Sequence, residues 1–266
     1  MKYFDAHSHI QFPPYDEDRD ELIADMQTQG IGSIVVGVDM DSSRKAVALA
    51  EQHENLWASV GLHPNDTPEE PFDHDAFLEL LKSPKVAAIG ECGLDNFRPE
   101  EPENEKARQR SVFELHVQLA IEADKPLMIH ARPSKGTQDA YKDIIDILGS
   151  YKKEHGEKVR GDIHFFVGGI EEARELIALD FTLSYTAVLT FTHDYDEVVR
   201  FAPLTHLLSE TDSPYVAPAP NRGKRNDPRA VKAVVNAIAG IRNEGSETVG
   251  VNILQNIERV FKVPQA

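Results

Sequence analysis

Short apolar runs and amphipathic segments alternate along nearly the whole chain. The runs typical of buried strands cover residues 2–10, 33–38, 56–62, 86–90, 126–130, 161–166, 181–187 and 204–208. Between and after them, apolar residues recur at helical spacing, which predicts helices over 19–29, 43–52, 75–81, 105–123, 138–151, 170–179, 194–201, 228–241 and 246–261. Eight strands alternating with helices over about 250 residues are typical of a (β/α)₈ barrel.

The same alternation also fits an open, doubly wound parallel sheet. A Gly-x-Gly-x-x-Gly motif after the first strand would favour that sheet, and the sequence has none there. No Gly/Ser-rich linker, low-complexity segment or short internal repeat interrupts the chain. We therefore expect residues 1–266 to form one domain of the α/β class, a TIM barrel.

The chain is strongly acidic, with a formal net charge of −17 from 45 acidic and 28 basic residues. This charge repels nucleic acid overall and argues against a general DNA-coating role, although a local basic patch or bound cations can still bring a polyanion to one site. No apolar run is long enough for a membrane span, and the first residues lack the features of a targeting peptide. The single cysteine, Cys92, excludes an internal disulfide. We expect a cytoplasmic location.

Two histidines close the first predicted strand, in the run Asp5-Ala6-His7-Ser8-His9. Side chains alternate across a strand, so His7 and His9 point to the same side. A lone histidine in such a place is more often a packing residue. A pair on one face of a buried strand is half of a metal site, because imidazole nitrogen is a common ligand of divalent transition metals.

Other side chains of the metal-binding type come at the ends of later strands: His63, Glu91, His130, His164, Glu210 and Asp212. In a barrel, the carboxyl ends of the strands meet at one rim, which carries the active site. Any one of these carboxylates could be a structural hydrogen-bond acceptor. Burying several together is costly, however, and a cation offsets their repulsion. The sequence therefore predicts a metal centre at this rim.

Basic residues follow three of the same strands: Arg98, then Arg132 and Lys135, then Arg222, Lys224, Arg225 and Arg229. Each alone could be a solvated loop residue, but together, on an acidic chain, they indicate an anionic substrate. We assign substrate binding to His63, Arg132, Arg222, Lys224 and Arg225. Arg225 could instead shape its own loop with Asn226 and Pro228.

From Phe4 to Phe261, the chain resembles the TatD family of metal-dependent hydrolases in the amidohydrolase superfamily. The motifs that carry the resemblance are Asp5-Ala6-His7-Ser8-His9, Gly61-Leu62-His63-Pro64, Gly90-Glu91-Cys92-Gly93-Leu94-Asp95, Ile129-His130-Ala131-Arg132, His164-Phe165-Phe166-Val167-Gly168, Glu210-Thr211-Asp212-Ser213-Pro214-Tyr215 and Lys224-Arg225-Asn226-Asp227-Pro228. Two positions depart from the family pattern: Phe165 stands where members often have cysteine, and Asn96 where many have an aromatic residue.

The resemblance implies a two-metal phosphodiesterase that acts on DNA, a deoxyribonuclease working as an exonuclease on single strands. His7, His9 and Asp212 would bind one divalent ion, His130 and His164 the second, and Glu91 would bridge the two. Glu210 would orient water or a ligand. Asp212 is also placed to take a proton from the attacking water, and this donor set suits magnesium, manganese or zinc.

Two other functions stay open from the sequence. The same site would serve a metal-dependent amide or ester hydrolase acting on a small metabolite, which the acidic surface fits at least as well. A non-enzymatic metal-binding or scaffold protein is the third hypothesis, and the complete ligand set argues against it. DNA is the partner we expect; no membrane or obligate protein partner is indicated, and we expect a monomer or weak oligomer.

Overall fold

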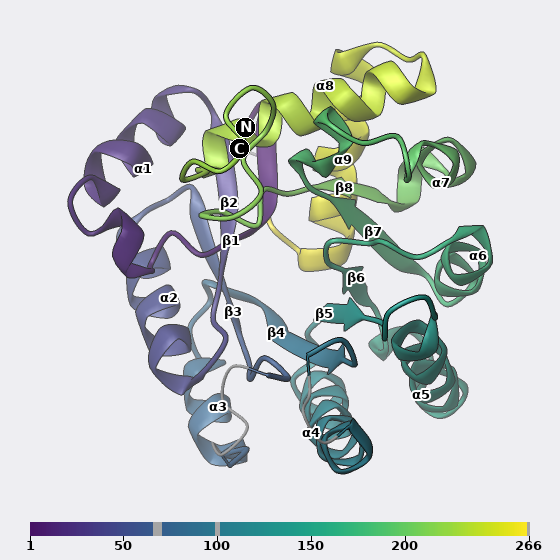
Figure 1. Ribbon diagram of the computed structural model, residues 1–266. Coiled ribbons are helices and arrows are strands. Elements are labelled where there is room, and N and C mark those ends of the chain that lie inside the picture. The colour runs from purple at the N-terminus through teal and green to yellow at the C-terminus, as the bar shows by residue number, and fades with distance from the viewer. Residues whose placement is uncertain (66–70, 99–101, 265–266) are drawn as a thin grey trace.

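The computed structural model describes residues 1–65, 71–98 and 102–264, and its strands form a nearly closed barrel (Figure 1). All neighbouring strands are parallel and pair in chain order. Their bounds are β1 Tyr3–Ser8, β2 Ile31–Val36, β3 Leu56–Val60, β4 Val86–Asp95, β5 Leu127–Arg132, β6 Gly161–Ile163, β7 Phe181–Tyr185 and β8 Leu207–Ser209. The predicted (β/α)₈ barrel is confirmed, and the open-sheet alternative is wrong.

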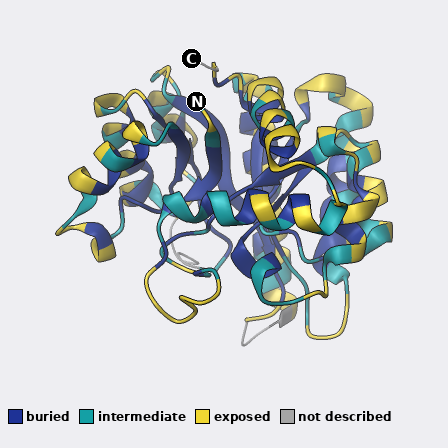
Figure 2. Cartoon of the chain, turned by 90° about the horizontal axis from the view of Figure 1, so that it is seen from above, coloured by how far each residue is buried: buried dark blue, intermediate teal, exposed yellow. Residues whose placement is uncertain are grey.

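Helices surround the barrel, so that the strands are buried on both faces (Figures 1 and 2). The α-helices are α1 Arg19–Thr28, α2 Met40–Gln52, α3 His74–Leu80, α4 Pro102–Ala123, α5 Asp139–His155, α6 Ile170–Ala178, α7 Asp196–Phe201, α8 Val231–Arg242 and α9 Ser246–Phe261. Short 3₁₀ helices cover Pro13–Tyr15, Gly156–Lys158, Ala187–Thr190, Leu204–His206 and Pro228–Ala230. No helix within the described residues is long and apolar enough to cross a bilayer.

Strands β1 and β8 lie side by side at the seam of the barrel, which sets the first predicted ligands beside the last. The buried carboxylate of Asp5 accepts hydrogen bonds from the backbone N–H of Thr211, at 2.8 Å, and from its hydroxyl, at 2.6 Å. One residue further on, the Asp212 N–H donates to the carbonyl of His7 at 3.0 Å. These bonds hold the end of β1 against the segment that carries Asp212.

Strand β4 is longer than predicted, because it continues to Asp95 instead of ending at Gly90. Both glycines of its motif allow the close approach to β5. A Cβ at Gly90 would lie 2.2 Å from the Met128 carbonyl oxygen, and one at Gly93 would lie 2.0 Å from that of His130. Both also have a φ of 142°, which side-chain-bearing residues rarely adopt. Glu91 therefore lies inside the strand, where the β4–β5 register shifts.

Other element ends also differ from the prediction. Strand β6 stops at Ile163, before His164, because the pairing with β5 and β7 ends there. Residues 204–206 form a 3₁₀ turn and not the start of β8, and residues 228–230 form another turn before α8. These shifts leave the predicted ligands at the same rim.

Candidate metal centre and active site

One oxygen of Glu91 faces a first group of ligand atoms from the β1–β8 seam. Glu91 Oε2 lies 3.3 Å from His7 Nε2 and 3.9 Å from His9 Nε2. The two imidazole nitrogens are 3.1 Å apart, and Asp212 Oδ1 lies 3.5 Å from His9 Nε2 and 4.0 Å from His7 Nε2. Ligands bound to one cation at about 2.0–2.2 Å are separated by distances of this size.

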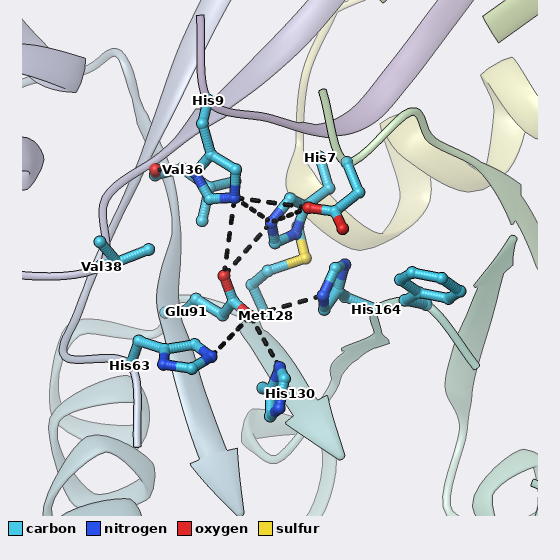
Figure 3. Close-up of polar contacts among 12 residues, drawn as sticks. His7, His9, Val36, Val38, His63, Glu91, Met128, His130 and His164 are labelled. Carbon is cyan, nitrogen blue, oxygen red and sulfur yellow. Dashed lines mark hydrogen bonds and ion pairs between the residues drawn. The ribbon is translucent and has the colours of Figure 1, made fainter. Parts of the chain in front are cut away.

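The other oxygen of Glu91 faces a second group (Figure 3). Glu91 Oε1 lies 2.9 Å from His130 Nδ1, 3.4 Å from His164 Nε2 and 3.6 Å from His63 Nε2. Figure 3 shows this carboxylate between the imidazoles of His7 and His9 on one side and the three imidazoles of the second group on the other. A single buried carboxylate thus joins two clusters of nitrogen atoms.

Acceptors outside the clusters face the outer ring nitrogens of two candidate ligands. His9 Nδ1 lies 2.8 Å from the Val36 carbonyl oxygen, which can only accept, so this nitrogen carries a proton. His130 Nε2 lies 3.3 Å from Asp95 Oδ2, which can accept its proton. Each imidazole can therefore keep a proton on its outer nitrogen when the nitrogen that faces Glu91 gives up its own to a metal ion.

His164 is held by the buried carboxylate of Glu210. Glu210 Oε1 accepts His164 Nδ1–H at 3.0 Å and the Phe165 N–H at 2.9 Å. Its Oε2 contacts the Ser184 hydroxyl at 2.6 Å, and that hydroxyl also lies 2.7 Å from Asp162 Oδ2. Because one hydroxyl hydrogen cannot serve two carboxylates, one proton is shared along this chain of three side chains. Burial and the charge of Glu210 raise the pKa of Asp162 to about 7.

The electrostatics of the clusters fit divalent cations. Burial alone would raise the pKa of Glu91, but the charges of His164, His63 and His7 and the hydrogen bond from His130 hold it well below its usual range. Likewise, burial favours the neutral form of His164, yet Glu210 and Glu91 raise its pKa to about 10. Histidines thus take up protons to balance the buried carboxylates, and metal ions can take the place of those protons.

A cavity of about 590 Å³ opens over the clusters. Its floor includes His9, His63, Glu91, His130, His164 and Asp212, and its walls include Phe12, Val38, Arg98, Arg132, Phe165, Val167, Val188, Tyr195 and Tyr215. Two guanidinium groups and several aromatic rings therefore border the same hollow as the candidate ligands. The residues present can hold a bound anion with an aromatic or apolar part.

Comparison with known proteins agrees with this geometry. The family model described as "TatD related DNase" matches residues 4–262. The chain belongs to the TatD family. It is 36% identical over 264 residues to the uncharacterized metal-dependent hydrolase YabD of Bacillus subtilis, covering 98% of this chain and 99% of YabD. It is 30% identical to the uncharacterized metal-dependent hydrolase YcfH of Escherichia coli K12, over 99% and 97% of the two chains.

A solved structure shares the fold of this TatD-family chain. The crystal structure of YjjV, a TatD homologue from Escherichia coli K12, superposes with a TM-score of 0.89 at 24% identity and covers 99% of both chains. At this identity the likeness concerns the fold alone.

The structure brings together every residue that the sequence assigned to metal binding: His7, His9, Glu91, His130, His164 and Asp212. His63, assigned to substrate binding, lies at the second cluster and lines the cavity. Glu210 is fully buried and is not among the described residues that line the cavity, so it reaches the centre through His164.

The basic residues divide into two groups. Arg132 lines the cavity, where its guanidinium lies 4.3 Å from the centroid of the Phe97 ring. Arg222 and Lys224 are exposed on the 216–226 loop and are not among the described lining residues. Arg222 lies over the ring of Phe191, with 4.1 Å between the guanidinium carbon and the ring centroid.

Arg225 holds its loop against the start of the chain. Its guanidinium makes a two-pronged contact with the Asp18 carboxylate, donates to the Pro14 carbonyl at 2.7 Å and lies over the Tyr15 ring. Arg225 is not among the described residues that line the cavity. The loop-shaping alternative raised from the sequence agrees with these contacts.

Sequence reasoning gave no role to Asp95, Gln109 or the aromatic walls. Asp95 could have been found from strand parity, because residues 91, 93 and 95 of one strand share a face. Gln109 lies on α4, where no local pattern marks it; its amide accepts the Asp95 N–H at 2.8 Å and donates to Asn65 Oδ1 at 2.9 Å. Contacts between elements so distant in sequence leave no signal in one chain.

Proposed function

We propose that this TatD-family chain is a divalent-metal-dependent phosphodiesterase that trims single-stranded DNA as an exonuclease. The observation that carries the proposal is Glu91, whose two oxygens face separate clusters of histidine nitrogens. A bridging carboxylate of this kind is what a pair of divalent ions requires. The names of the relatives YabD and YcfH as metal-dependent hydrolases support the same class of chemistry.

Two ions would be held by the residues of the two clusters. His7, His9 and Asp212 would bind one ion, His130 and His164 the other, and Glu91 both. When bound, a pair of divalent ions lowers the pKa of water and stabilises charge on the attacking and leaving oxygens of a phosphodiester. Magnesium, manganese and zinc all fit this mixture of carboxylate and imidazole ligands.

Asp212 is the proposed general base. Burial would raise its pKa, but the hydrogen bond from His9 and the charges of His164 and His7 keep it below its ordinary value. The carboxylate is therefore ionised at neutral pH, and it lines the cavity. Asp212 can accept the proton of the attacking water, while Glu210 keeps His164 in the tautomer that faces the centre.

The walls of the cavity support a nucleic acid as the substrate. The Arg98 and Arg132 guanidinium groups suit phosphate oxygens, which they can bind in a forked geometry. Tyr215 and Phe12 lie on the wall near His9, and aromatic rings of this kind stack on bases in proteins that bind single strands.

A small-metabolite amide or ester hydrolase is the second candidate, favoured by two observations. The cavity has the volume of a small-molecule site. Arg222, Lys224 and Arg225, which the sequence assigned to substrate binding, are not among the described residues that line it.

A metal-reconstituted activity panel tests the proposal. Metal-free protein is loaded with magnesium, manganese or zinc and assayed on single-stranded DNA, duplex DNA, RNA, small phosphodiesters, carboxylic esters and amides. Metal-dependent release of nucleotides, fastest from single-stranded DNA and lost in Glu91→Gln, is the expected result. Activity on carboxylic esters or amides with none on any phosphodiester would favour the second candidate.

A further inference from the structure

His63 differs from its neighbours at the second cluster in the position of its ring proton. Its Nδ1 accepts the backbone N–H of Asn65 at 3.2 Å. Because a neutral imidazole has one N–H and one lone pair, the proton of His63 lies on Nε2. This Nε2 points toward the centre, 3.6 Å from Glu91 Oε1 (Figure 3). His130 and His164 differ in that their outer nitrogens face carboxylate acceptors, Asp95 and Glu210, which can take the ring proton.

Contacts of the His63 backbone and of the Asn65 side chain support this orientation of the ring. The backbone N–H of His63 donates to the Val38 carbonyl at 2.8 Å, which fixes the start of the loop. The side chain of Asn65 accepts a hydrogen bond from the buried amide of Gln109 at 2.9 Å, and Gln109 is anchored in turn on the backbone of Asp95. The Asn65 N–H is thereby held toward His63.

We infer that His63 is a catalytic hydrogen-bond donor and not a metal ligand. A nitrogen that bears a proton has no lone pair for a cation, so the arrangement with Asn65 removes His63 from the ligand set although it lies as near to Glu91 as the ligands do. Its Nε2–H faces the cavity, where it can donate to a phosphoryl oxygen of the substrate. The inference rests on the proposed phosphodiesterase function for the identity of that oxygen.

The role needs no change in protonation. A neutral N–H donor aimed at the reacting phosphoryl group strengthens its hydrogen bond as negative charge grows on the oxygen. Removal of one such preorganised donor typically lowers kcat by about 10²–10³-fold. Removal of a metal ligand, by contrast, would also remove the ion that it holds.

The first experiment separates a donor from a ligand without measuring activity. His63→Leu removes the N–H and keeps an apolar side chain, and His130→Leu is the matched control at the same cluster. Elemental analysis at saturating zinc should find the wild-type number of ions in His63→Leu and fewer in His130→Leu. Long-range ¹H–¹⁵N correlation spectra of the zinc-loaded wild type should show a proton on His63 Nε2. Loss of an ion in His63→Leu, or a zinc-bound His63 nitrogen, overturns the inference.

The second experiment tests the donor role itself. Turnover of a bis-nitrophenyl phosphodiester should fall about 10²–10³-fold in kcat for His63→Leu. His63→Gln, whose amide N–H can reach the position of the ring Nε2, should retain more activity. Circular dichroism confirms that each variant is folded. Unchanged kcat in folded His63→Leu overturns the inference.

If the wild type cleaves no phosphodiester, the proposed function fails, and the binding of inorganic phosphate to the zinc-loaded protein then decides about His63. Weaker phosphate binding in His63→Leu supports the donor role. Equal binding overturns it.

Discussion

Replacing Glu210 by glutamine separates orientation of a ligand from proton transfer. The amide oxygen can still accept His164 Nδ1–H and the Phe165 N–H, which Glu210 Oε1 accepts at 3.0 and 2.9 Å. The amide NH₂ can donate to Ser184, whose hydroxyl is then free to donate to Asp162. Every polar group keeps a partner, so the fold is expected to survive, but His164 loses the negative charge behind it.

The size of the effect on metal binding follows from the contact between Glu210 and His164. Loss of a carboxylate that orients a ligand histidine typically weakens metal affinity by about 10–100-fold, or about 1.4–2.7 kcal/mol. Titration calorimetry with manganese or zinc measures this change. Once metal is saturating, kcat should return to within about tenfold of the wild type, whereas loss of a general base would cost about 10²–10⁴-fold.

The same substitution should weaken the fall in stability of the metal-free protein between about pH 5 and about pH 8. The pKa of Asp162 is raised to about 7 by burial and by the charge of Glu210. A carboxyl with a raised pKa contributes stability below its unfolded pKa, and that contribution is lost as pH rises through the folded value. Without the charge of Glu210, the pKa of Asp162 is raised less. The free energy of unfolding then falls less with pH, by on the order of 1 kcal/mol.

Urea unfolding at about pH 5 and about pH 8 checks this sign, with the exposed Glu247→Gln as the control for simple loss of charge. An orienting role for Glu210 would be wrong if Glu210→Gln keeps full metal affinity, or if its kcat stays about 10²-fold or more below the wild type at saturating metal. The second result would make Glu210 the base.

Three further predictions concern the base, the ligands and the cavity walls. Asp212→Asn should keep the fold and lose about 10²–10⁴-fold in kcat; near-normal turnover in the metal-loaded variant would move the base to Glu210. Metal affinity, measured by calorimetry from about pH 6 to about pH 8, should rise with pH. The pKa values of His9, His130 and His164 are raised, and their protons must leave before metal binds. A flat profile would contradict the assignment of these ligands. The double substitution Arg98→Ala and Arg132→Ala should raise the KM for single-stranded DNA and flatten the logarithmic salt dependence of binding by about 0.7 per residue. Arg225→Ala should leave that slope unchanged, because the Arg225 charge is already paired with Asp18. Equal slopes in all variants would mean that the cavity walls do not contact phosphates.

The order of elements and the candidate ligands at the barrel rim could be predicted from the sequence, because both depend on local patterns. His7 and His9 share a face by strand parity alone, and the barrel brings the later strand ends to the same rim. The motif at Glu91 was recognised, yet its place inside β4 was not, because the strand continues only through its pairing with β5 at Asp95 and Arg132.

Contacts between distant segments could not be predicted. Arg225 was assigned to substrate binding because it is charged. The Asp18 carboxylate that pairs with it lies more than two hundred residues away in the chain. His63 was assigned to substrate binding and lies at the cavity, but the direction of its ring proton depends on the loop backbone at Asn65, which periodicity does not specify. Similarly, Asp162 and Glu210 meet only because β6, β7 and the end of β8 lie side by side.

In the proposed active site, Glu91 joins two metal ions. Anomalous X-ray diffraction from crystals of the protein saturated with manganese or zinc would locate these ions. We expect two peaks, one on each side of the Glu91 carboxylate and about 3.5–4 Å apart, the first beside His7, His9 and Asp212 and the second beside His130 and His164. A single peak at saturation, with His130 and His164 unliganded, would contradict it.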